Sequence, residues 1–209
     1  EYETYHDIVP DRNDGVNAWI AVMRGCDNFC SFCVVPYTRG RERSRDPEGI
    51  VEEARRIADQ GFKQITLLGQ NVNSYRSGDW DFARLITAVA DVPGIKRVRF
   101  TSPHPKDFPV SLLEAVVSHP NICKQIHLPL QSGSDRMLGL MNRTYTNTEY
   151  RTLVDRIRNL RSDIVLSTDI ICGFCGESDE DFAETYRLVE ESRFHSAFIF
   201  KYSERKNTI

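Results

Sequence analysis

Six short apolar runs recur along this chain, and the distance between them constrains its fold more than any other feature. They cover residues 18–23, 64–68, 97–101, 125–128, 164–168 and 196–200. Most are rich in β-branched or aromatic residues and are bounded by polar, glycine or proline residues, as β-strands are. Successive runs start 28 to 46 residues apart, which is the length of a strand–helix–strand unit. The spacing therefore predicts parallel strands joined by helical crossovers.

Helical patterns fill the intervals between these runs. In residues 47–60 the apolar positions recur with the helical period, Asp46 precedes them as an N-cap, and Gly61 follows. Similar patterns cover residues 80–90, 110–118, 146–160 and 178–191. Six strand–helix units are too few for an eight-stranded barrel, so an open doubly wound sheet and a partial barrel both fit. In either fold, ligands bind at the carboxyl ends of the strands.

Composition is that of an ordinary globular domain. Of the 209 residues, 40% are hydrophobic and 27% charged, which excludes disordered and collagen-like chains. No apolar run approaches the ~20 residues of a membrane span, and residues 1–14 lack the apolar segment of a signal peptide. We therefore expect a cytoplasmic, non-membrane domain over residues 17–209, with residues 1–16 as a lead. Because the first residue is not methionine, we also expect a longer parent protein.

Six cysteines are more than such a chain usually carries, and three of them are clustered. Cys26, Cys30 and Cys33 follow the first predicted strand with the spacing C-x3-C-x2-C. Three thiolates on so short a loop can converge on one centre, and a 4Fe-4S cubane fits because its fourth iron stays open for a substrate. The alternatives are three buried structural cysteines and a structural zinc site. Zinc would need a fourth ligand, for which the candidates are His104, His127 and Cys123.

The cysteine loop, with the aromatic Phe32 before its third cysteine, resembles that of the radical S-adenosylmethionine superfamily. Further stretches resemble one branch of it, the tRNA methylthiotransferases: residues 24–30, 34–45, 67–75, 127–134 and 141–143. Residues 37–45 and 67–75 look most like the enzymes that modify N6-isopentenyl-adenosine beside the anticodon. Sister enzymes acting on threonylcarbamoyl-adenosine or on a ribosomal protein are the alternative, and a zinc-stabilised nucleic-acid-binding module is a more distant one. The resemblance covers residues 17–205 and implies an α/β fold, a partial (β/α)6 barrel.

This resemblance also implies a reaction and a set of site residues. Cys26, Cys30 and Cys33 would ligate a 4Fe-4S cluster, at which S-adenosylmethionine is cleaved to a 5′-deoxyadenosyl radical that activates C2 of the adenine. Residues expected to contact the cofactor follow the strands: Phe32, Gly69, Gln70, Asn71, Ser102, Gln131, Ser132, Arg143 and Asp169. The second strand's loop would hold the methionine amino group, Arg143 the carboxylate, and Asp169 the ribose hydroxyls. Gln131 and Ser132 would face the ribose and the methionine end.

A basic segment follows the cysteine loop. Residues 37–45 carry four arginines and one glutamate, a net charge of +3, although the whole chain has a net charge of −3. Such a run is often a solvated loop. Beside the cluster, we expect it to hold the tRNA anticodon arm through phosphate contacts and stacking. The residues expected to do so are Tyr37, Arg39, Arg41 and Arg43.

The resemblance implies further parts and partners. The related enzymes carry an N-terminal domain with a second 4Fe-4S cluster, which is the sulfur source, and a C-terminal RNA-binding barrel; we identify neither in these 209 residues. We expect a monomer that takes electrons from a flavodoxin or ferredoxin, cleaves S-adenosylmethionine slowly and forms no methylthiolated product alone. One departure stands out: Cys175 occupies the usual proline position of a Gly-Phe-Pro-Gly-Glu motif and forms a C-x2-C pair with Cys172. A structural role for this pair is favoured over a redox role.

Overall fold

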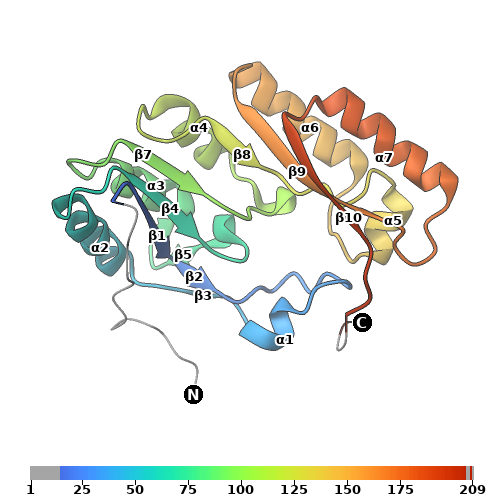
Figure 1. Cartoon of the computed structure of the whole chain (residues 1–209), viewed down its shortest axis with the longest axis horizontal. Coiled ribbons are helices and arrows are strands. Elements are labelled where there is room, and N and C mark those ends of the chain that lie inside the picture. The colour runs from blue at the N-terminus through green and yellow to red at the C-terminus, as the bar shows by residue number, and fades with distance from the viewer. Residues whose placement is uncertain (1–14, 206–207, 209) are drawn as a thin grey trace.

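The chain is described here from a computed structural model that covers residues 15–205 and 208. Most of the predicted lead, residues 1–14, lies outside the described residues. Two three-stranded parallel sheets form the centre of the fold (Figure 1). One has the order β1 (Asn17–Ala21), β4 (Gln64–Leu68), β7 (Arg97–Phe100), and the other β8 (Gln125–His127), β9 (Val165–Cys172), β10 (Ser196–Lys201). A parallel bridge between Val98 and Ile122 connects them. The six predicted strands are therefore present, parallel and in chain order.

Helices form the crossovers between these strands. They are α2 (Pro47–Asp59), α3 (Phe82–Ala90), α4 (Val110–Ser118), α6 (Asn147–Leu160) and α7 (Asp179–Ser192). Figure 1 shows the two sheets as an arch, with α6 and α7 together on the outer side of β9 and β10. Capping boxes at Thr146 and Ser178 satisfy backbone donors at the starts of α6 and α7. No helix in the described part of the chain is both long and apolar enough to cross a membrane.

Several short elements in the loops were not predicted, because they are shorter than the window over which a helical or strand period can be recognised. Antiparallel pairs join β2 (Met23–Arg24) to β3 (Arg43–Ser44), and β5 (Arg76–Ser77) to β6 (Trp80–Asp81). The remaining short elements are helices α1 (Val35–Arg39) and α5 (Asp135–Leu140) and the 3-10 turns η1 (Val72–Ser74) and η2 (Pro105–Asp107). Two predicted boundaries shift as a result: the first strand ends at Ala21, and the helix predicted from Trp80 begins at Phe82.

Two groups of buried side chains hold the strand ends in place. The main core lies between sheets and helices, and Tyr75, Tyr150 and Phe82 are among its largest fully buried members. Burial of each such ring contributes on the order of 2–3 kcal/mol. The Tyr150 hydroxyl donates to the Leu128 carbonyl oxygen at 2.7 Å, which anchors α6 at the end of β8. A smaller group contains Met137, Met141 and Phe174, with Phe32 of the cysteine loop packed against it.

Candidate cluster and cofactor site

Backbone strain is concentrated in the loops at the carboxyl ends of the strands. Among the described residues, five other than glycine have a positive φ. Four of them lie in or beside these loops: Phe29 (47°), Ser102 (58°), Gln131 (66°) and Asn142 (53°). Such conformations cost roughly 1–3 kcal/mol each and persist where the surrounding structure imposes them, often at functional sites. The strain therefore indicates the edge at which Ser102 and Gln131 were predicted to act.

The cysteine loop supplies three free thiols. Cys26 and Cys30 are each 9% exposed and Cys33 is half-buried. Burial raises the pKa of the Cys26 and Cys33 thiols, and the neighbouring Cys30 adds to both shifts. Buried thiolates need a compensating cation, which a bound metal centre provides. In the described part of the chain, no three His, Cys, Asp or Glu side chains form a group that could hold a metal ion.

The start of this loop is clamped by two other segments. Gly25 has a φ of +81°, and a Cβ atom there would lie 2.0 Å from the Arg41 carbonyl oxygen, so only glycine fits. Its amide donates to Gln70 Oε1 at 2.7 Å, and the Cys26 amide donates to the Gly40 carbonyl oxygen at 3.2 Å. The predicted cofactor residue Gln70 therefore orients the cysteine loop.

The opposite side of the loop is held by the end of α5. The Ser31 amide and hydroxyl donate to the carbonyl oxygens of Met141 and Leu140, at 3.0 and 2.8 Å. Asn142 Nδ2 donates to the Phe29 carbonyl oxygen at 2.8 Å. The loop is thus tied to segments more than 100 positions away in the sequence.

Arg143 lies directly against a cysteine. Its Nη1 donates to Cys30 Sγ at 3.3 Å, and its Nη2 donates to the Pro129 carbonyl oxygen at 3.3 Å. Nε donates to the Tyr145 hydroxyl at 3.1 Å, and Cζ lies 5.0 Å from the centre of that ring. A fixed guanidinium at this position stabilises negative charge on the sulfur. The predicted contact with the cofactor carboxylate stays a prediction.

At the end of β4, Gly69 is required because other parts of the protein pack closely against it. A Cβ atom there would lie 2.7 Å from Met23 Cγ and 3.1 Å from Val72 Cα. Asn71 is 2% exposed, and its Oδ1 atom is buried without a hydrogen-bond partner among the described residues. An unpaired buried acceptor is costly, which makes it a candidate to receive a hydrogen bond from a ligand.

Asp169 was predicted to follow the fifth strand, but it lies inside β9, which extends to Cys172, and its side chain is beside a histidine. Gln131 pairs with β9 through its amide, which donates to the Asp169 carbonyl oxygen at 2.8 Å. Asp169 Oδ2 lies 3.1 Å from His127 Nε2, while His127 Nδ1 lies 3.0 Å from Ser167 Oγ. His127 had no assigned cofactor role at the sequence level, because its partners lie 40 and 42 positions away.

The structure does not bring Ser132 together with these residues. Its side chain is fully buried, and its hydroxyl lies 3.1 Å from Thr185 Oγ1 of α7. Close packing explains this, since a Cβ atom on the adjacent Gly133 would lie 2.6 Å from Thr185 Cα. In this structure Ser132 therefore has a role in packing α7.

The basic segment packs on the cysteine loop, and its arginines are in different environments. Tyr37 and Arg39 are exposed, whereas Arg43 is half-buried in β3. Arg41 is exposed but forms an ion pair with Asp27, with Nε 2.6 Å from Oδ1. The Phe29 ring contacts Tyr37 edge-on, with centroids 6.0 Å apart. Tyr37, Arg39 and Arg41 are thus all exposed, and the Arg41 side chain is already engaged by Asp27.

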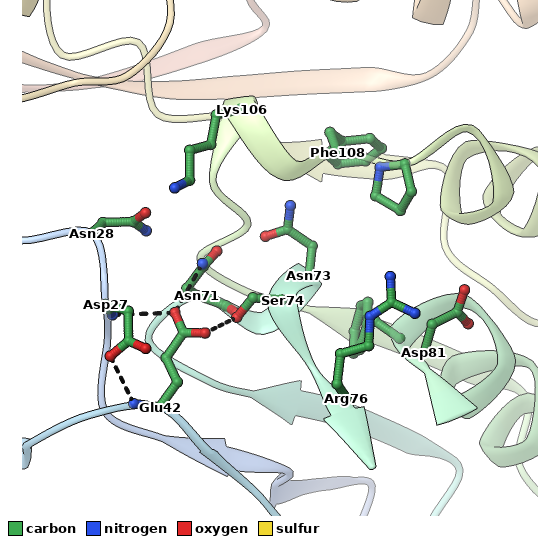
Figure 2. Close-up of a pocket in the computed structure, with 12 residues that line it drawn as sticks. Asp27, Asn28, Glu42, Asn71, Asn73, Ser74, Arg76, Asp81, Lys106 and Phe108 are labelled. Carbon is green, nitrogen blue, oxygen red and sulfur yellow. Dashed lines mark hydrogen bonds between the residues drawn. The ribbon is translucent and has the colours of Figure 1, made fainter. Parts of the chain in front are cut away.

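Next to the cysteine loop lies a pocket of about 480 Å³ (Figure 2). Its walls include Asn28 of the loop, Asn71, and Lys106 from the segment after β7. Glu42 also lines it and was missed at the sequence level, where the net positive charge of residues 37–45 directed attention to the arginines. Most of its lining side chains are polar or charged, and the apolar ones are Phe82, Phe108 and Pro109.

Comparison with known proteins settles the family. The model of the radical SAM superfamily matches residues 20–189. This chain belongs to the radical SAM superfamily. A protein from Prosthecochloris aestuarii named tRNA-2-methylthio-N(6)-dimethylallyladenosine synthase is 51% identical over 208 residues, covering 99% of this chain and 47% of that protein. A protein of the same name from Acetivibrio thermocellus is 52% identical over 204 residues, covering 96% and 42%.

The chain thus spans about half the length of the curated relatives that it matches. Solved structures agree on the fold. The radical S-adenosylmethionine methyltransferase TsrM from Kitasatospora setae superposes with a TM-score of 0.72 at 17% identity, covering 94% of this chain and 36% of that one. Methylornithine synthase gives a TM-score of 0.64 at 15% identity, covering 92% and 55%. The predicted α/β fold of the radical SAM type is confirmed.

Proposed function

We propose that this chain is the radical domain of a tRNA methylthiotransferase that modifies C2 of N6-isopentenyl-adenosine beside the anticodon. The proposal depends on sequence identities of 51% and 52% to relatives that are named for that reaction. It also favours this substrate over threonylcarbamoyl-adenosine or a ribosomal protein. The three free thiols at the carboxyl edge of the strands support a cluster-binding domain over a zinc-stabilised binding module.

Three free cysteine thiols on one loop are the donor set of a 4Fe-4S cluster, and they would have to draw together around it, because in the described structure they do not yet form a group that could hold a metal ion. Cys26, Cys30 and Cys33 would hold the cluster, and burial of the first two excludes water. The chemistry that cluster and cofactor supply together is reductive formation of a 5′-deoxyadenosyl radical. Arg143 stabilises the charge on the Cys30 sulfur through its Nη1 donor. The unpaired Asn71 Oδ1 would accept a hydrogen bond from the methionine ammonium group.

Several finer expectations belong to the same proposal. The Asp169 carboxylate, held by His127, would accept hydrogen bonds from the ribose. The exposed Tyr37 and Arg39 would contact the anticodon arm. A flavodoxin or ferredoxin in the cytoplasm would supply electrons. In the full-length protein a second 4Fe-4S cluster would supply the sulfur.

Anaerobic reconstitution with iron and sulfide tests the proposal. The protein should turn brown, bind about four irons as a cubane requires, and with dithionite convert S-adenosylmethionine to methionine and 5′-deoxyadenosine. Alanine in place of Cys26, Cys30 or Cys33 should abolish the colour and the cleavage, whereas Cys123→Ala should retain both. A colourless protein that holds stoichiometric zinc would contradict the proposal. Mass spectrometry of tRNA nucleosides from a deletion strain would identify the substrate base.

A further inference from the structure

Glu42 is the point at which the cysteine loop and the loop after β4 meet. Its Oε1 accepts hydrogen bonds from the Asp27 amide at 3.3 Å and from Asn71 Nδ2 at 3.1 Å. Its Oε2 accepts one from the Ser74 hydroxyl at 2.6 Å. Figure 2 shows these contacts at the wall of the pocket. Three donors from two loops therefore converge on one half-buried carboxylate.

A carboxylate can only accept hydrogen bonds, and this decides how the Asn71 amide is turned. Nδ2 must face Glu42, so Oδ1 must face away from it. That oxygen is the buried atom without a partner among the described residues. If the amide turned over, Oδ1 would face the Glu42 carboxylate and the two acceptors would repel each other. The structure thus leaves one buried acceptor of Asn71, a residue that lines the pocket, without a hydrogen bond among the described residues.

We propose that Glu42 is a positioning residue, which fixes the Asn71 amide with Oδ1 directed at the cofactor and ties that amide to the cysteine loop. This inference rests on the proposed function for the identity of the cofactor. The tie to the cysteine loop runs through Asp27, the residue after Cys26. Asp27 in turn accepts a hydrogen bond from the Glu42 amide through Oδ1 at 3.1 Å. Movement of either loop would therefore disturb both the cluster ligands and the acceptor.

The Glu42→Gln variant distinguishes a role in positioning Asn71 from a direct effect of the negative charge on the cofactor. Glu42→Gln keeps an oxygen toward Asn71 and Asp27, while its new amide group can face Ser74. The Ser74 hydroxyl can then act as acceptor and donate to the Asn71 carbonyl oxygen, which already lies 2.8 Å away. Glu42→Leu removes every acceptor at this position. Positioning thus predicts that glutamine substitutes for glutamate and leucine does not, whereas attraction of a cationic cofactor by charge predicts that both variants fail.

The experiment measures the affinity of the reconstituted protein for S-adenosylmethionine under anaerobic conditions. Glu42→Leu should weaken binding tenfold or more, and Glu42→Gln less than threefold. Asn71→Ala should weaken binding similarly, and adding Glu42→Leu to it should cost clearly less than Glu42→Leu costs alone, because the glutamate acts on the cofactor mainly through the asparagine. Glu48→Gln, an exposed change in the first turn of α2, is the matched control. Equal losses for leucine and glutamine, or additive effects in the double variant, would overturn the proposal.

A second readout is independent of cluster and cofactor. In the ¹⁵N-labelled protein without iron, the Asn71 side-chain amide protons should exchange with water at least tenfold faster in Glu42→Leu than in wild type or Glu42→Gln. Unchanged exchange in Glu42→Leu would overturn the positioning role. If the wild-type protein binds no S-adenosylmethionine, the proposed function fails, while this exchange rate still decides the role of Glu42.

Discussion

Gly25→Ala should break the contacts that hold the start of the cysteine loop against Gln70 and Gly40. The new Cβ atom would lie 2.0 Å from the Arg41 carbonyl oxygen and 2.5 Å from that of Gly40, where ordinary contact begins at 3.4 Å. The obstacle is backbone rather than a flexible side chain, so one segment must move by more than about 1 Å. A positive φ costs a residue with a Cβ atom about 1–2 kcal/mol. Loss of the hydrogen bonds to Gln70 and Gly40 adds about 1 kcal/mol each, which gives a total of about 3–4 kcal/mol.

Gly61→Ala is the matched control, because Gly61 also has a positive φ, +93°, but nothing lies within 4 Å of the Cβ position. Urea unfolding of the iron-free, reduced protein should show a loss of about 1–2 kcal/mol for the control and about 3–4 kcal/mol for Gly25→Ala. After reconstitution, only Gly25→Ala should lose bound iron. Equal destabilisation of the two variants with full iron content in both would refute the reasoning.

Two further predictions concern pH and salt. Burial, assisted by Arg143 and Lys106, lowers the pKa of His104 to about 2, so unfolding takes up a proton below the unfolded-state pKa of about 6.5. The free energy of unfolding should be highest above about pH 6.5 and fall by up to about 1.4 kcal/mol per pH unit below it. Urea titrations at several pH values should show a smaller slope in His104→Gln. An unchanged slope would contradict the role of His104. Arg39→Glu should weaken tRNA binding and reduce the salt slope of log Kd by about 1, whereas an unaltered slope would remove Arg39 from the interface.

Much of the fold was predictable because it depends on local sequence. Parallel strands require crossovers of a minimum length, so the distance between apolar runs predicted parallel strands, while it left their order open between a doubly wound sheet and a partial barrel. Asp46, Thr146 and Ser178 cap their helices through neighbours three positions on, and such contacts are visible in a short stretch of sequence. The elements that were missed, such as α5 and the β2–β3 pair, are too short to show a period or pair with residues about 20 positions away.

For the candidate site, too, local features were predictable from the sequence and long-range contacts were not. The sequence by itself determined that three cysteines share a loop after the first strand, because their spacing is local. Only the tertiary structure decided that Arg143 contacts Cys30 across 113 positions, that Glu42 orients Asn71 across 29, and that Ser132 packs against α7. Those contacts depend on how far each crossover helix carries the chain and how closely adjacent strand-end loops pack. Neither quantity can be predicted from the hydrophobic period or the composition of any one segment.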